Sequence, residues 1–295
     1  MAGIREILKT SRVETCDMPW EEYKAFPAMN GSTLSRGIRS MLDLRHSWDN
    51  PKEDTDSMLW GRAVHCLCLE PGEFLNRYVP WEGARRQGKA YEEFAIEAAV
   101  AGKEVLTLNQ WYAAQRAALA FVKNPRVKPL IASGKAEQTV LATEMGMQHK
   151  GRLDWVSSPV CTPEYDCPNG VIADLKTSAD IHHHAFGRVF YKFHYDMKLG
   201  LYQRWWEAAT GLRLPVFVMC LQGDPRGSKD RPHDVAVIPI PDAVLDRGVR
   251  TGLEAIRNLR EAIATNFWPG VDGGEEYFLD TPPWEMGDEM VEFEE

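Results

Sequence analysis

Long apolar runs are missing from this sequence of 295 residues. The longest clean apolar stretch, LPVFVMCL at residues 214–221, has the length of a buried strand and is far too short to span a membrane. The first ten residues, MAGIREILKT, hold no continuous apolar segment, so we expect no secretory signal peptide. These absences predict a cytoplasmic protein.

Cysteine is also scarce, and its six residues are Cys16, Cys66, Cys68, Cys161, Cys167 and Cys220. So few cysteines in a chain of this length argue against a disulfide framework. Cys161 and Cys167 suggest a fragment of a zinc or iron–sulfur site, but such sites usually bring closer pairs such as CxxC, and the sequence contains none. We therefore expect reduced, structural thiols.

Basic residues are absent from the last 25 positions, where residues 271–295 hold ten Asp or Glu. The net charge of −9 belongs to this tail, because the other 270 residues contain 33 acidic and 34 basic groups. A neutral body can carry local basic patches, so nucleic acid is not excluded as a partner. The tail, with its interspersed aromatics, either imitates a nucleic acid strand, docks a basic partner, or is simply solvated.

The remaining composition, 44% hydrophobic and 26% charged, is that of a folded globular protein. The first half predicts helices at 32–45 (capped by Ser32 or Thr33), 58–70, 89–101 and 109–123. The second half predicts strands at 137–144, 150–157, 171–176, 216–222 and 234–239, a loop at 158–170, and helices at 180–189, 195–210 and 242–265. This order predicts an α/β core with a helical N-terminal half packed on it.

Two of the predicted strands end in charged residues that suit a metal site. Asp154 lies in GRLDWV, and Asp174 and Lys176 lie in VIADLKTS. Residues two apart on a strand share a face, and a hairpin connection would bring Asp154 beside Asp174. Two carboxylates and a lysine form a site for Mg²⁺ or Mn²⁺, where a metal activates water and stabilises charge on a phosphate. The alternative interpretation is a strand end with a surface ion pair.

The ordered set of motifs resembles the PD-(D/E)xK nuclease superfamily, and more specifically the RecE-type phage and prophage exonucleases related to the nuclease domain of exonuclease VIII. The similarity runs from about residue 23 to about residue 221. The segments that carry it are WGRAVHCLCLEPGEFLNRYV, PWEGARRQGKAYEEF, AEQTV, GRLDWV, IADLKTSAD and YDMKLGLY. The resemblance implies a restriction-endonuclease-like mixed central sheet flanked by helices. It also implies one nuclease domain over residues 1–270 (1–135 mainly helical, 136–270 the catalytic core), followed by the tail.

The resemblance assigns roles to particular residues. Asp154 and Asp174 become metal ligands, Lys176 the catalytic lysine, and the carbonyl of Leu175 a further ligand. His65 matches a family histidine that approaches the metals from the helical half, although an apolar helix can also hold a core histidine. Glu137 matches a family acid near the site, or is a plain strand-edge charge.

The resemblance also implies DNA contacts. Lys198 stands where the family has glutamine, and Tyr202 is retained four residues later on the same helix face. Lysine can only donate hydrogen bonds, so Lys198 contacts a DNA phosphate or is a solvated helix charge. Arg85, Arg86 and Lys89 match a segment that holds the 5′-phosphate of a DNA end, which a planar guanidinium suits; the alternative is a solvated face.

Taken together, the resemblance implies a Mg²⁺-dependent double-strand DNA exonuclease, with Mn²⁺ as a substitute, in the cytoplasm of a bacterial host. It implies 5′-to-3′ degradation, 3′ overhangs for a single-strand annealing protein, and a homo-oligomer such as a tetrameric ring. No Fe–S cluster is expected, because Cys220 is the single cysteine after Lys176. The alternatives are another PD-(D/E)xK endonuclease or flap nuclease, and a catalytically impaired adaptor that binds DNA ends.

Overall fold

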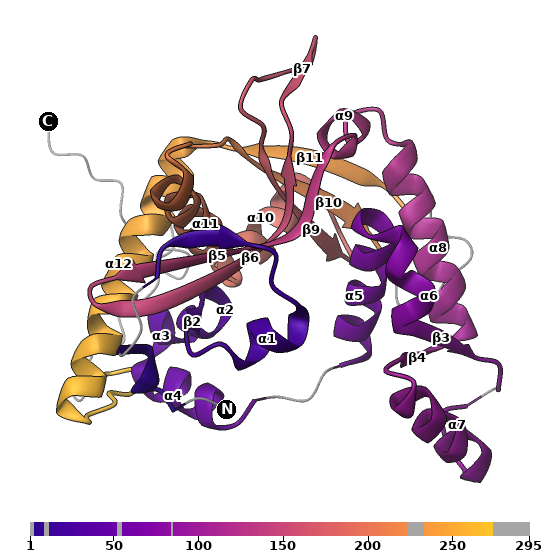
Figure 1. The fold of residues 1–295 in the computed structure, drawn as a ribbon, viewed down its shortest axis with the longest axis horizontal. Helices are drawn as coiled ribbons and strands as arrows, with labels where there is room; N and C mark the ends of the chain where they lie inside the picture. The colour runs from indigo at the N-terminus through magenta and orange to yellow at the C-terminus, as the bar shows by residue number, and fades with distance from the viewer. Residues whose placement is uncertain (1–2, 9–11, 52–54, 84, 224–232, 274–295) are drawn as a thin grey trace, which may run out of the picture.

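The computed structural model describes residues 3–8, 12–51, 55–83, 85–223 and 233–273. Within these ranges a mixed seven-stranded sheet lies at the centre (Figure 1). Its order is β1 (Glu14–Cys16), β5 (Gly134–Glu144), β6 (Met147–Ser157), β9 (Ile172–Ser178), β10 (Val216–Gln222) and β11 (Val235–Ile240), with β2 (Met29–Asn30) paired to β6. The β9–β10 and β2–β6 pairs are parallel and the other neighbours are antiparallel.

The helices lie around this sheet. They are α1 (Trp20–Ala25), α2 (Gly31–Leu34), α3 (Arg36–Arg39), α4 (Met41–Asp49), α5 (Asp56–Leu69), α6 (Phe74–Arg77), α7 (Lys89–Val100), α8 (Leu108–Lys123), α9 (Lys128–Ile131), α10 (His183–Lys192), α11 (Tyr195–Thr210) and α12 (Asp242–Thr265). Two small sheets complete the fold, β3 (Tyr78–Trp81) with β4 (Glu104–Thr107) and β7 (Val160–Thr162) with β8 (Tyr165–Cys167). None of the described helices is long and apolar enough to cross a membrane.

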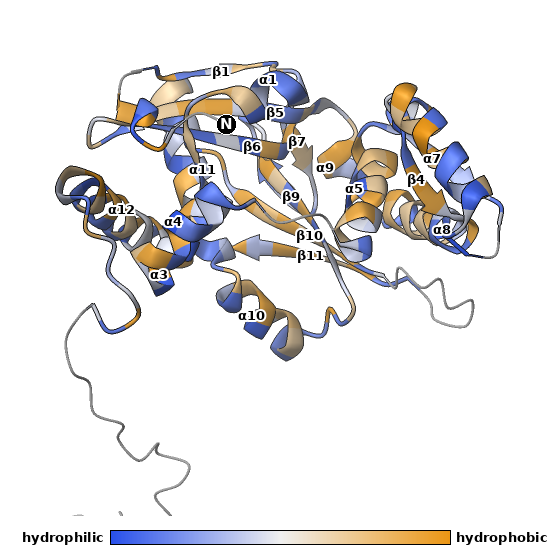
Figure 2. Ribbon diagram, turned by 90° about the horizontal axis from the view of Figure 1, so that it is seen from below, coloured by the Kyte–Doolittle hydropathy of each residue, from blue (hydrophilic) through white to orange (hydrophobic). Residues whose placement is uncertain are grey.

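Strand β10 shows why the sheet is covered on both faces. Val216, Val218 and Cys220 belong to the core formed with α11 and α12, whereas the alternate residues Phe217, Met219 and Leu221 belong to the core formed with α5 and α8. Successive side chains of a strand point to opposite faces, so a continuous apolar run is buried on both. Figure 2 shows apolar residues concentrated in β9 and β10, between the two groups of helices.

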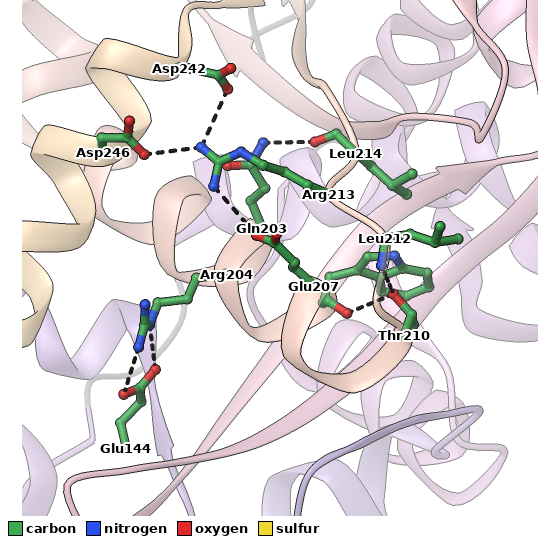
Figure 3. A network of polar contacts seen from close by, with 11 residues as sticks. Glu144, Gln203, Arg204, Glu207, Thr210, Leu212, Arg213, Leu214, Asp242 and Asp246 are labelled. Atoms are coloured by element: carbon green, nitrogen blue, oxygen red, sulfur yellow. Dashed lines mark hydrogen bonds and ion pairs between the residues drawn. The ribbon is translucent and has the colours of Figure 1, made fainter.

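Helices α11 and α12 pack closely because glycines face the neighbouring backbone. A Cβ at Gly248 would lie 2.2 Å from the Asp196 carbonyl oxygen, and one at Gly200 would lie 2.4 Å from that of Leu245. Figure 3 shows the polar contacts that join the end of α11 to the start of α12. Arg213 approaches Asp246 at 3.0 Å and Asp242 at 3.5 Å. These contacts join α11 to α12.

The predicted mixed α/β fold with a helical N-terminal region is confirmed. The predicted single helix at 32–45 is wrong, since α2, α3 and α4 occupy this stretch. Asn30 caps α2, and Ser40 is extended and caps α4 by accepting a hydrogen bond from the Asp43 N–H at 2.9 Å. A side-chain cap of this kind satisfies a free backbone N–H and starts a new helix.

Two further expectations change. The stretch 158–170, predicted as a loop, contains the β7–β8 hairpin, because Val160, Tyr165 and Cys167 are buried in the core of α5 and α8. The N-terminal half also supplies β1 and β2 to the main sheet.

The six cysteines are free thiols. Most of the predicted acidic tail, residues 274–295, lies outside the described residues.

Candidate functional site

The two predicted carboxylates are brought together by strand pairing. Strands β6 and β9 are antiparallel, with Trp155 opposite Ala173. Asp154 and Asp174 lie next to this pair, one on each strand. The Leu175 N–H donates a hydrogen bond of 2.8 Å to Asp154 Oδ2, which ties the strand ends together. The predicted neighbourhood of Asp154 and Asp174 is therefore present.

Lys176 lies between the two carboxylates. Its Nζ forms a short ion pair with Asp174, lies 3.7 Å from Asp154 Oδ2, and donates to the Leu175 carbonyl at 3.2 Å. Burial acts to lower the pKa of Lys176, but the negative charges of Asp174 and Asp154 raise it above its ordinary value. The lysine is therefore an ammonium at neutral pH and supplies a half-buried positive charge.

Burial also raises the pKa of both aspartates. Desolvation is the largest cause for Asp154 and for Asp174, and the positive charge of Lys176 opposes it in each case. One ammonium compensates the buried Asp174 and the half-buried Asp154 only in part, so the site favours an additional cation. Asp174 Oδ2 is buried and accepts no well-formed hydrogen bond, even though Lys176 lies beside it.

Helix α5 places His65 against these carboxylates. The helix starts at the Thr55 cap, whose hydroxyl oxygen accepts a hydrogen bond from the Met58 N–H at 3.3 Å, and it buries Trp60 and Val64 in the core. His65 Nδ1 then lies 3.6 Å from Asp154 Oδ2. Burial, followed by the charge of Lys176, lowers the pKa of His65 to about 4. The imidazole is thus neutral at physiological pH, as a metal ligand must be.

The donor atoms gathered here suit a hard divalent cation. Carboxylate oxygens of Asp154 and Asp174, the Leu175 carbonyl and the His65 imidazole are the ligand types that Mg²⁺ and Mn²⁺ accept. In the positions shown, no three His, Cys, Asp or Glu side chains of the described residues form a group that could hold a metal ion. A cation would therefore share the carboxylates with the Lys176 ammonium or displace it from Asp174.

Glu137 lies at the edge of this cluster. On β5 the ladder pairs Ala136 with Trp155 and Gln138 with Leu153, and Glu137 between them has a φ of 55°. Its carboxylate forms a short ion pair with Arg152. Burial and the charge of Asp154 raise the pKa of Glu137, while Arg152 opposes the shift. A non-glycine residue with positive φ is strained, and strain of this kind concentrates at functional sites.

Arg152 was missed by sequence reasoning. Besides Glu137 it contacts the Met18 carbonyl at 2.8 Å, and its guanidinium lies 5.6 Å from the centre of the Trp20 ring and 5.5 Å from that of Tyr23. Its position in GRLDWV, two residues before Asp154, places it next to the site, but a strand pattern does not reveal its partners.

Tyr195, also missed, connects Lys198 to the site. Lys176 Nζ lies 5.4 Å and Lys198 Nζ 5.0 Å from the centre of the Tyr195 ring. Burial, with the charge of Lys176, lowers the pKa of Lys198 to about 8. Tyr202 lies one turn after Lys198 on α11, where Gly31 and Gly151 leave room for its ring. The signal for Tyr195 in the sequence is the aromatic run FYKFHY.

The predicted phosphate-binding residues lie elsewhere, between β3 and α7. Arg86 contacts Asp56 at the start of α5, the side chain of Gln110 and the Val105 carbonyl. Asp56 is nine residues before His65, which corresponds to about 13 Å along a helix. Lys89 is exposed and pairs with Glu93 at 3.6 Å, and Arg85 is exposed. The phosphate-binding role of Arg85, Arg86 and Lys89 stays a prediction.

Comparisons with known proteins add to this geometry. Residues 34–281 match the family model described as a PDDEXK-like domain of unknown function (DUF3799). Among solved structures, the chain is similar to one named "Putative exonuclease" from Eubacterium rectale, with a TM-score of 0.57 and 14% identity over 90% of this chain and 96% of that chain. At this identity the likeness concerns the fold. The search of curated proteins found no match.

Proposed function

Because the chain belongs to the family of PDDEXK-like domains of unknown function, we propose that it is a metal-dependent exonuclease acting on the ends of double-stranded DNA. The observation that carries the proposal is the cluster of buried Asp174 with half-buried Asp154 and Lys176, and with neutral His65 against it. Two carboxylates and one lysine on adjoining strand ends form the arrangement for which the family is named. The structural neighbour named as an exonuclease supports the same activity.

The residues divide the chemistry of phosphodiester hydrolysis among them. Asp154, Asp174, His65 and the Leu175 carbonyl would hold Mg²⁺ or Mn²⁺, which, when bound, acidifies water and polarises the phosphate. Lys176 is an ammonium, so it acts by donating hydrogen bonds and stabilising negative charge that grows on the phosphate oxygens. Water oxygen bonds to phosphorus while the bond to the leaving sugar oxygen breaks, and a proton passes to that oxygen.

The direction, product and partners are proposed on the sequence resemblance. We infer 5′-to-3′ degradation that leaves 3′ single strands for an annealing protein, in a homo-oligomer that encloses the duplex. The rivals are an endonuclease or flap nuclease of the same superfamily and an adaptor that binds DNA ends without cutting.

Digestion of labelled duplexes in Mg²⁺ distinguishes these functions. Linear duplex with a 5′-phosphate should release mononucleotides from the 5′ end, and closed circular duplex should stay intact. Lys176→Ala protein and EDTA are the matched controls and should show no release. Cutting of the closed circle would identify an endonuclease, and end binding by wild type without release in Mg²⁺ or Mn²⁺ would identify an adaptor.

A further inference from the structure

An aromatic segment, residues 190–195 with the sequence FYKFHY, extends from the surface toward the cluster of Asp154, Asp174 and Lys176. It covers the end of α10 and the start of α11, and Figure 2 shows α10 at the periphery of the fold. Phe190 is buried, but Tyr191 is 44% and Phe193 is 49% exposed. Single exposed apolar residues are common on protein surfaces, so the position of these rings relative to the site, and not their exposure alone, is informative.

The backbone holds Phe193 in a defined orientation. His194, which caps α11, is in the left-handed region with φ 52° and ψ 45°. This conformation brings the rings of Phe193 and Tyr195 into a stack, with centroids 5.9 Å apart and planes inclined by 25°. Left-handed backbone at a non-glycine residue costs energy and persists where the surrounding structure requires it.

The stack reaches the proposed reaction centre through Tyr195. The inner ring, Tyr195, lies under the ammonium groups of Lys176 at 5.4 Å and Lys198 at 5.0 Å. The outer ring, Phe193, stacks on Tyr195 and is half exposed. A group that stacks on Phe193 is therefore separated from Lys176 by the rings of Phe193 and Tyr195.

The charges around Phe193 favour a polyanion. Lys192 Nζ lies 5.9 Å from the Phe193 ring, and Arg188 on α10 is exposed. The acid nearest in sequence, Asp196, is buried and pairs with Arg247 at 3.2 Å. Aromatic rings among basic side chains are the typical surface for single-stranded nucleic acid, whose bases stack and whose phosphates need positive charge.

We propose that Phe193 stacks against an unpaired base of the DNA strand whose phosphate lies at Asp154, Asp174 and Lys176. Apart from those of the terminal pair, paired bases have both faces covered by their neighbours, so the proposal places the strand single-stranded at this point. The inference rests on the proposed function, and it adds a specific base contact and a strand-separated end to it.

Abasic scanning of the substrate tests the contact. Duplexes carry one abasic nucleotide at each of the first positions from the 5′ end, and Mg²⁺-dependent release is timed. Stacking of one base is worth about a tenfold change, so wild type should slow about tenfold at one position. Phe193→Ala should be slow on the intact duplex and insensitive to that abasic position, whereas Phe193→Tyr should behave as wild type.

The matched control is Phe267→Ala. Phe267 is also an exposed phenylalanine, at 62%, but it follows α12 where Pro269 contacts Leu42 of α4. Its removal should leave rates and abasic sensitivity unchanged. Phe193→Leu keeps an apolar side chain without an aromatic face, so it should behave as Phe193→Ala. Unchanged thermal melting of these variants excludes a folding defect.

A binding measurement separates this inference from the proposed function. Lys176→Ala protein in Ca²⁺ is mixed with DNA that carries 2-aminopurine at the identified position, or at each terminal position if no cleavage occurs. Stacking of the labelled base on Phe193 quenches its fluorescence. In the double variant that carries both Lys176→Ala and Phe193→Ala, this quenching should be absent. Full quenching and full abasic sensitivity in Phe193→Ala would overturn the stacking contact while leaving the nuclease intact. A change in oligomeric state alone would make Phe193 a protein interface and would also overturn it.

Discussion

Two charged regions stand out in the sequence, the cluster on β6 and β9 and the basic segment at residues 85–89. In the structure they differ in burial and in the partners of their charges. Lys176 is half-buried between two carboxylates that it only partly neutralises. Arg86 is tied to Asp56, Gln110 and Val105, and Lys89 is exposed to solvent. Buried, incompletely compensated charge interacts strongly with a ligand, whereas exposed charge is screened. The comparison predicts chemistry at the first cluster and positioning or stability at the second.

The largest effect should follow removal of the half-buried ammonium. Lys176→Ala is expected to lower the rate of nucleotide release by about 10³-fold, because loss of one buried donor to a reacting group costs that much. DNA-end binding, measured by fluorescence anisotropy in Ca²⁺, should stay within a few-fold of wild type. Lys89→Ala is the exposed-lysine control and should retain its rate; equal losses in both variants would contradict the comparison.

Metal binding should stabilise the protein through the same carboxylates. A ligand at 100 times its Kd raises the free energy of unfolding by about 2.7 kcal/mol. Saturating Mg²⁺ should therefore raise the melting temperature of wild type, and Asp174→Asn should lose the response, since an amide lacks the charge that a hard cation needs. Asp166, on the exposed side of β8, provides the control Asp166→Asn, which should keep the full shift.

Arg86 should matter for stability more than Lys89. Arg86→Ala removes a guanidinium that joins α5, β4 and α8, and it leaves Gln110 without this donor. Hydrogen bonds to a charged group are worth about 2 kcal/mol, so the free energy of unfolding in urea should fall by about that amount. Lys89→Ala should change it by less than about 0.5 kcal/mol. Identical denaturation curves for the two variants would show that the contacts of Arg86 do not stabilise the fold and that its guanidinium is available for another role.

The neutral state of His65 predicts a pH dependence of stability. Its pKa is about 4 in the folded protein against an ordinary value of 6.5, so between these values the unfolded chain binds more protons and stability falls as the pH falls. At pH 5 this amounts to about 2 kcal/mol for one histidine. His149, which is buried with a pKa of about 3, contributes in the same window. In EDTA, His65→Asn should therefore be less sensitive to pH between 7 and 5 than wild type; an unchanged slope would show that His65 is not held neutral.

The smallest effect is expected at Arg85. If this exposed guanidinium holds the 5′-phosphate, dephosphorylation of the DNA end should slow wild type several-fold and Arg85→Ala much less. The ratio of rates on phosphorylated and dephosphorylated duplex is the measurement. The same ratio in both proteins would remove Arg85 from the DNA interface.

Local patterns predicted much of the fold and of the site. The helices α8, α11 and α12 and the strand β10 follow from apolar periodicity over long segments, where propensity and burial agree. The spacing of Asp174 and Lys176 placed both on one strand face, and antiparallel pairing of β6 with β9 brought Asp154 next to them. Such predictions succeed because they depend on neighbours within a few residues or on one strand pairing.

Other features were decided by tertiary structure, because they depend on contacts between distant segments. The β7–β8 hairpin reflects packing that no local signal revealed, whereas the break at Ser40 follows a local side-chain cap that the sequence interpretation overlooked. The partners of Arg86, which are Asp56, Gln110 and Val105, come from three separate elements and become visible only in the folded chain. Tyr195 became part of the site only when the fold placed the start of α11 with this ring by Lys176 of β9. The sequence alone determined which residues carry charge and apolar surface; the assembled sheet and helices decided which charges are buried together, since burial is a property of the whole fold.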